Sequence, residues 1–131
     1  MVYFTKFVNI KVIKGIGVGG EISFPTLNLQ INQKEKLSEY GVYICEIDIQ
    51  KKSYVGLVHY GPKSIGTDNI NKIFLEVHVL DFNRNVYGEV VTIHLLKKIR
   101  EVRKFKDVDA LKKQIEKDIQ ITKKYFNAEQ T

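Results

Sequence analysis

Cysteine is almost absent from this sequence, which has one among its 131 residues. A single cysteine excludes an internal disulfide and any metal site that needs several thiolate ligands. Cys45 stands in the alternating run Tyr43, Cys45 and Ile47, so we expect it to be a small core residue.

Long apolar runs are absent as well. No stretch approaches the roughly 20 consecutive apolar residues that a bilayer-spanning helix requires. The N-terminal residues Met1 to Lys6 lack the charged-then-apolar layout of a secretory signal peptide. We therefore expect a cytoplasmic protein with no membrane partner. The composition, 44% hydrophobic and 27% charged, is that of an ordinary globular protein, and the length predicts one domain over residues 1–131.

Acidic residues are outnumbered by basic ones. The sequence has 21 Lys and Arg against 15 Asp and Glu, a net charge of +6. A basic surface favours anionic partners, either nucleic acids or nucleotide phosphates. Many of these cations lie near the C-terminus, interleaved with Asp and Glu rather than in one dense tract, which is equally typical of a solvated surface. The charge alone therefore leaves these alternatives open.

Apolar and polar residues alternate with a period of two along most of the chain, which predicts strands with one buried face. A polar turn, Gln50-Lys51-Lys52, separates two of these segments, and a turn-rich loop over 61–71 separates two others. No helical pattern intervenes, so the strands point to an antiparallel barrel or sandwich. The predicted strands cover residues 7–13, 27–31, 41–49, 53–59, 73–80 and 89–96.

Near the C-terminus the apolar spacing changes to three and four, which is one face of a helix. The pattern predicts a helix over 108–126. Asp107 suits its N-cap, and Lys123 and Lys124 suit its last turn, where cations interact favourably with the helix dipole. Residues 127–131 are expected to fray. The apolar face of this helix comprises Val108, Leu111, Ile115, Ile119, Thr122 and Phe126.

A glycine cluster, Gly15, Gly17, Gly19 and Gly20, follows the first predicted strand. It matches the pattern G-x-G-x-x-G, but a dinucleotide-binding loop needs a helix directly after it. Pro25 and a period-two segment come instead, so that interpretation fails, and no Gly-Lys-Ser/Thr follows to make a P-loop. Two interpretations remain: a loop whose backbone N–H groups cradle phosphate, or a flexible hairpin with bulges.

Thr26 and Asn28 are two apart on a predicted strand, so their side chains point to one face. A hydroxyl and an amide oxygen are hard, neutral ligands that suit Mg²⁺ when bound phosphates supply most of the negative charge. The alternative is the polar outward face of an edge strand.

Glu76 shares a predicted strand face with Phe74, His78 and Leu80. A carboxylate beside apolar side chains, when partly buried, suits a general base working near neutral pH. The alternative is a solvated strand face.

Several short motifs follow one another in a fixed order along the chain. They are Gly15 to Gly20, Phe24-Pro25-Thr26-Leu27-Asn28, Gly41-Val42-Tyr43, Glu76-Val77-His78, Asp81-Phe82 with Tyr87-Gly88, and Arg100 with Phe105. Together they resemble the riboflavin kinase (flavokinase) family, including the kinase module of bacterial bifunctional FAD synthetases. The similarity covers nearly the whole chain.

The resemblance implies a mainly β fold, a six-stranded antiparallel Greek-key barrel with one C-terminal helix. It also implies the reaction of riboflavin with ATP to give FMN and ADP. In the family, the Thr and Asn of the Pro-Thr-x-Asn motif hold Mg²⁺ at the nucleotide; these match Thr26 and Asn28. The family's catalytic Glu, which takes the proton from the ribityl 5′-hydroxyl, matches Glu76.

The resemblance extends to both substrates. The family's glycine loop covers the ATP phosphates, which assigns Gly15, Gly17 and Gly19 to nucleotide binding. The flavin packs near the segment before the last helix, where Arg100 and Phe105 match. The partners expected from the resemblance are riboflavin or FMN and ATP or ADP, with no nucleic acid, and we expect a monomer.

Three functional hypotheses follow. The first is an active riboflavin kinase. The second is a flavin- or nucleotide-binding module that has lost catalysis, because Val18 and Val102 replace a basic and an acidic residue of the family pattern. The third is a basic β-barrel that binds nucleic acid, although its aromatics are spread over core-like positions rather than along exposed strands beside Lys or Arg.

Overall fold

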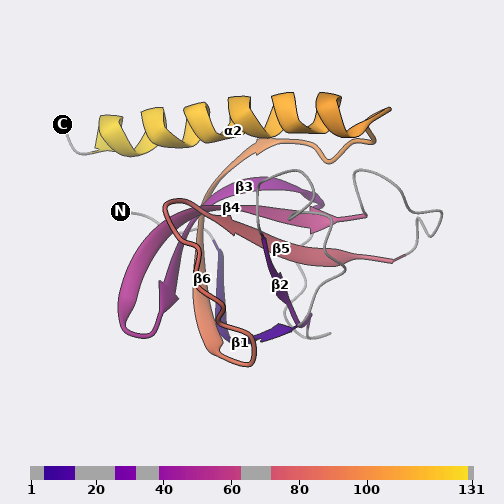
Figure 1. The fold of residues 1–131 in the computed structure, drawn as a ribbon. Coiled ribbons are helices and arrows are strands. Elements are labelled where there is room, and N and C mark those ends of the chain that lie inside the picture. Colours follow the sequence, from indigo (N-terminus) through magenta and orange to yellow (C-terminus); the bar gives the residue numbers. More distant parts are fainter. Residues whose placement is uncertain (1–4, 14–25, 32–38, 63–71, 130–131) are drawn as a thin grey trace.

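The computed structural model describes residues 5–13, 26–31, 39–62 and 72–129, and it shows a β-barrel with a helix lying across its outside (Figure 1). All six predicted strands are present, with β6 running past the predicted end at residue 96. The elements are β1 (Thr5–Ile13), β2 (Leu27–Leu29), β3 (Gly41–Ile49), β4 (Lys52–Gly61), β5 (Phe74–Val79), β6 (Val90–Arg100) and the helix α2 (Val108–Glu129).

The strands form a closed barrel in the order β1-β2-β5-β4-β3-β6, and every neighbouring pair is antiparallel. Strands β3, β4 and β5 follow one another as neighbours. Strand β2 pairs with β5 and β6 pairs with β3, so both connections at the ends of this meander are of the Greek-key type. The predicted Greek-key barrel is confirmed.

The alternation read from the sequence corresponds to the inside and outside of the barrel. Leu75, Val77 and Val79 of β5 are buried, and the residues between them are half-buried on the other face. Cys45 is fully buried in the same core, as predicted. Burial raises the pKa of the Cys45 thiol, because the thiolate would lose its hydration.

Helix α2 covers part of the outer face of the barrel (Figure 1). Beneath it lies a second apolar cluster, to which β3 contributes from the face opposite the core. This explains why β3 is almost continuously buried instead of alternating. The cluster contains Val42, Ile44, Leu57 and Leu96, with Ile99, Ile119, Tyr125 and Phe126 packed against them.

The start of α2 is as predicted, but its end is not. The backbone N–H of Ala110 donates to Asp107 Oδ1 at 2.8 Å, so Asp107 is the N-cap. The helix continues to Glu129, and its last turn holds no basic residue, so the placement of Lys123 and Lys124 there is wrong. Tyr125 and Phe126 pack on the barrel at the predicted end, and the helix continues for three residues beyond them.

The apolar face of the helix also begins later than predicted. Val108 is 40% exposed, because the packed stretch starts one turn further on, at Leu111. Nowhere in the described ranges is there a helix apolar enough over a sufficient length to cross a membrane.

A buried ion pair joins the end of β6 to the helix. Asp118 is 2% exposed, and its carboxylate accepts hydrogen bonds from Arg100 Nε at 3.0 Å and from an Arg100 terminal nitrogen at 2.8 Å. Gln114 donates to the same carboxylate at 2.9 Å. Each charge lies largely out of water, so the removal of either partner would leave the other charge buried without compensation.

We expect Asp118→Ala to lower the free energy of unfolding by about 3 kcal/mol, because it leaves the Arg100 guanidinium without its carboxylate. Denaturant unfolding followed by circular dichroism measures the change. Glu116→Ala, an exposed acidic residue of the same helix, is the matched control and should change stability by less than about 0.5 kcal/mol. Equal effects from both substitutions would contradict the importance of the pair.

Candidate functional site

Three polar side chains meet where β2 pairs with β5. Leu27 and Leu29 of β2 face the core, so Thr26 and Asn28 point to the outer face. Asn28 lies directly opposite Glu76 of β5, and Thr26 Oγ1 lies 3.5 Å from Glu76 Oε2, a long hydrogen bond. All three are half-buried. The predicted metal pair and the predicted base are therefore neighbours, although they lie 50 residues apart along the chain.

The structure adds His59, which the sequence analysis did not select. His59 of β4 lies opposite Glu76 on the side away from Asn28, so the three side chains share one face. His59 Nε2 is 2.8 Å from the carbonyl oxygen of Pro62. A carbonyl oxygen only accepts, so Nε2 carries the proton in this contact. Only the pairing register reveals that His59 belongs to this site.

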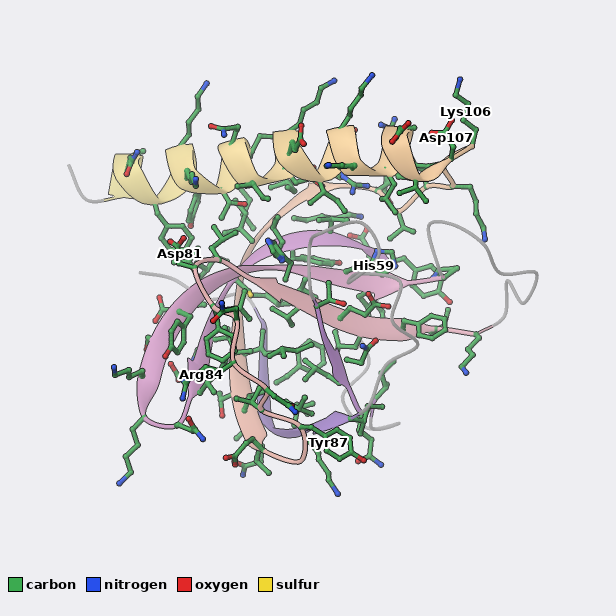
Figure 2. The ribbon with its side chains drawn as sticks, viewed as in Figure 1. His59, Asp81, Arg84, Tyr87, Lys106 and Asp107 are labelled. Carbon is green, nitrogen blue, oxygen red and sulfur yellow. The ribbon has the colours of Figure 1, made fainter. Side chains whose placement is uncertain are left out.

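A cavity of about 690 Å³ opens beside these residues. Thr26 and Asn28 line one side, and the loop between β5 and β6 lines the other with Phe82, Arg84 and Tyr87 among its residues. Tyr87 is 63% exposed (labelled in Figure 2). In the sequence, Asp81-Phe82 and Tyr87-Gly88 of this loop matched family motifs, but no role in binding was assigned to them. A cavity of this volume lies within the usual range for small-molecule sites.

The donor set suits a magnesium ion that is held jointly with a bound anion. Thr26 and Asn28 offer a hydroxyl and an amide oxygen next to the Glu76 carboxylate. Over the ranges that the structure describes, no three His, Cys, Asp or Glu side chains come together as a metal site. A cation here would thus need further oxygen ligands from a bound phosphate or from water.

The two predicted flavin residues also lie together. The Arg100 guanidinium is 5.9 Å from the centre of the Phe105 ring, and that of Arg103 is 5.0 Å from it. Glu76 pairs with His59, His59 with Val42 and Val42 with Arg100, so three strand spacings separate Glu76 from Arg100. At the usual spacing of neighbouring strands, Arg100 lies roughly 14 Å from Glu76 around the barrel. Arg100 is at the same time engaged by Asp118, so it has a structural role that the sequence analysis did not predict.

The predicted phosphate loop lies outside the described residues. Gly15, Gly17 and Gly19 fall in the range 14–25, so their assignment to nucleotide binding stays a prediction.

Comparisons with known proteins agree with the resemblance. A family model described as Flavokinase, riboflavin kinase, matches residues 4–126. The chain is 38% identical over 118 residues to the bifunctional riboflavin kinase/FMN adenylyltransferase of Buchnera aphidicola subsp. Schizaphis graminum. The match includes 89% of this chain and 38% of that protein. It is 36% identical over 115 residues to the RNA-binding riboflavin kinase RibR of Bacillus subtilis, with 88% of this chain and 49% of that protein covered.

A solved structure has the same architecture. The riboflavin kinase of Trypanosoma brucei superposes with a TM-score of 0.64 at 23% identity, covering 95% of this chain and 82% of that one. This likeness supports the fold. The chain spans less than half the length of either of the two curated relatives described above.

Proposed function

The chain belongs to the riboflavin kinase family, and we propose that it transfers the γ-phosphoryl group of ATP to the 5′-hydroxyl of riboflavin, giving FMN and ADP. The observation that carries this proposal is the meeting of Thr26, Asn28 and Glu76 at the edge of a cavity large enough for a nucleotide. Phosphoryl transfer requires mainly positioning and charge neutralisation, together with one base for the attacking hydroxyl.

In this proposal the nucleoside part of ATP occupies the cavity and its phosphates extend toward Thr26 and Asn28. Two features support this direction. The polar oxygen donors lie on the β2 side of the cavity, and the exposed Tyr87 ring on the loop side offers a surface on which a base can stack. The predicted loop from Gly15 to Gly19 would cover the phosphates.

Thr26 and Asn28 would hold Mg²⁺ together with the ATP phosphates. When bound, the ion neutralises charge that develops on the phosphoryl oxygens. The chain supplies only neutral oxygens from these two residues, so most of the negative charge around the ion comes from ATP itself. Metal binding is therefore expected to depend on the nucleotide.

Glu76 would take the proton from the riboflavin 5′-hydroxyl as that oxygen attacks phosphorus. It lies between Asn28 and His59, directly beside the predicted metal ligands. A hydroxyl near its carboxylate therefore also lies near the terminal phosphate. The isoalloxazine ring would pack toward Arg100 and Phe105.

The proposal further includes a monomeric protein acting in the cytoplasm, where ATP is available, with residues 1–131 working as one unit. Nothing in it requires nucleic acid.

Incubation of the protein with riboflavin, ATP and Mg²⁺ should yield FMN, resolved from riboflavin by chromatography with fluorescence detection. The FMN peak should disappear when EDTA removes the metal ion. Retained riboflavin binding with no FMN would instead identify a binding module and overturn the kinase.

Glu76→Gln should lower kcat by about 10²- to 10⁴-fold, because the amide cannot accept the proton. Riboflavin binding and the melting temperature should change little, since the amide has the same shape. His78→Gln is the matched control, because His78 lies two residues further along β5 on the same face. Turnover of Glu76→Gln at the parental rate would show that another group is the base.

Asn28→Ala should raise the Mg²⁺ concentration needed for half-maximal activity about tenfold, because one oxygen ligand is lost. Saturating Mg²⁺ should recover much of the rate. A titration of activity against Mg²⁺ at fixed ATP measures the shift. An unchanged requirement for Mg²⁺ would remove Asn28 from the ligand set.

A further inference from the structure

One wall of the cavity is the loop between β5 and β6, residues 80–89. Its ends are tied to neighbouring strands. The N–H of Leu80 donates to the carbonyl of Val55 at 2.8 Å, and that of Gly88 donates to the carbonyl of Val12 at 2.9 Å. The stretch between these anchors lines the cavity and has no regular secondary structure. Side chains must therefore help to fix its position.

Arg84, in the middle of this loop, reaches to the hairpin between β3 and β4 (Figure 2). One terminal nitrogen donates to Gln50 Oε1 at 2.7 Å, and the other donates to the Tyr54 hydroxyl at 3.1 Å. The guanidinium also lies 5.0 Å from the centre of the Phe82 ring. One side chain thus joins the cavity wall to the β3–β4 hairpin by two hydrogen bonds, while its contact with Phe82 lies within the loop.

The groups that Arg84 contacts are themselves fixed. The rings of Tyr54 and Phe82 pack edge to face with centres 4.9 Å apart, and Gln50 Nε2 donates to Glu89 Oε1 at 2.7 Å. Gln50 and Lys51 both have left-handed backbone angles, with φ of 50° and 70°. A two-residue hairpin turn of this kind matches the right-handed twist of its strands. Arg84 therefore ties the loop to a regular β-hairpin.

We infer that Arg84 is a positioning residue for the phosphoryl donor, because it clamps the 80–89 loop to the β3–β4 hairpin and so sets the width of the cavity. This inference rests on the proposed function, in which ATP occupies the cavity. A wall that is already in place does not have to be ordered when the nucleotide binds. Arginine suits the role because its planar fork serves two acceptors at once, whereas lysine is a single point donor.

The test is the steady-state kinetics of Arg84→Ala. The KM for ATP should rise about three- to tenfold, since binding must now order the loop. The kcat at saturating ATP and the KM for riboflavin should stay within about twofold of the parent. A residue that matters only for stability would lower the melting temperature and leave both KM values alone.

Three further variants sharpen the comparison. Arg84→Lys should give an intermediate KM for ATP, and Tyr54→Phe, which removes one acceptor but keeps the ring, should shift it in the same direction by less. Lys112→Ala removes an exposed positive charge from α2 and should leave the KM for ATP unchanged. A parental KM for ATP in Arg84→Ala, or an equal rise in the KM for riboflavin, would overturn the clamp.

Direct titration with Mg-ATP keeps this inference separate from the proposed kinase. If the parent binds ATP but makes no FMN, the kinase fails, and a Kd three- to tenfold weaker in Arg84→Ala would still support the clamp. If Arg84→Ala binds ATP as tightly as the parent, the clamp fails while the kinase stands. A parent that binds no ATP would overturn both.

Discussion

The short strand β2 is the element on which the rest of the structure depends. It has three residues, yet it pairs with β1 on one side and with β5 on the other, through Val12↔Leu29 and Leu27↔Val77. These ladders close the sheet into a barrel. The same pairing sets Asn28 opposite Glu76. The strand pairing that closes the barrel is therefore also the one that assembles the site.

The hydrophobic core also fixes which side chains face the ligands. Leu27 and Leu29 pack on the core, so Thr26 and Asn28 must point outward. A slip of one residue would turn both leucines toward water and bury a hydroxyl and an amide without partners. The energy that favours the correct register thus also favours the correct site.

The sequence allowed much of the fold to be predicted, because strand alternation and the Asp107 cap are local patterns. The neighbours Asn28 and Glu76 were matched through motifs of a known family, since no local pattern relates residues so distant. His59 and the contacts of Arg84 escaped prediction, because they depend on register and on the path of an irregular loop. The end of α2 was misplaced because neither glycine nor proline marks it in the sequence after Phe126.

Helix α2 covers one part of the outer face of the barrel and leaves another part open. Part of the outer face over β3, β4 and β6 is apolar, and α2 covers that part. Over β2 and β5 it carries Asn28 and Glu76 and borders the cavity. Arg100 lies at the end of β6, on the covered side, where Asp118 ties it to the helix. The ion pair that anchors the helix therefore also fixes the position of a residue that the proposed function assigns to the flavin, so the two roles of Arg100 are coupled.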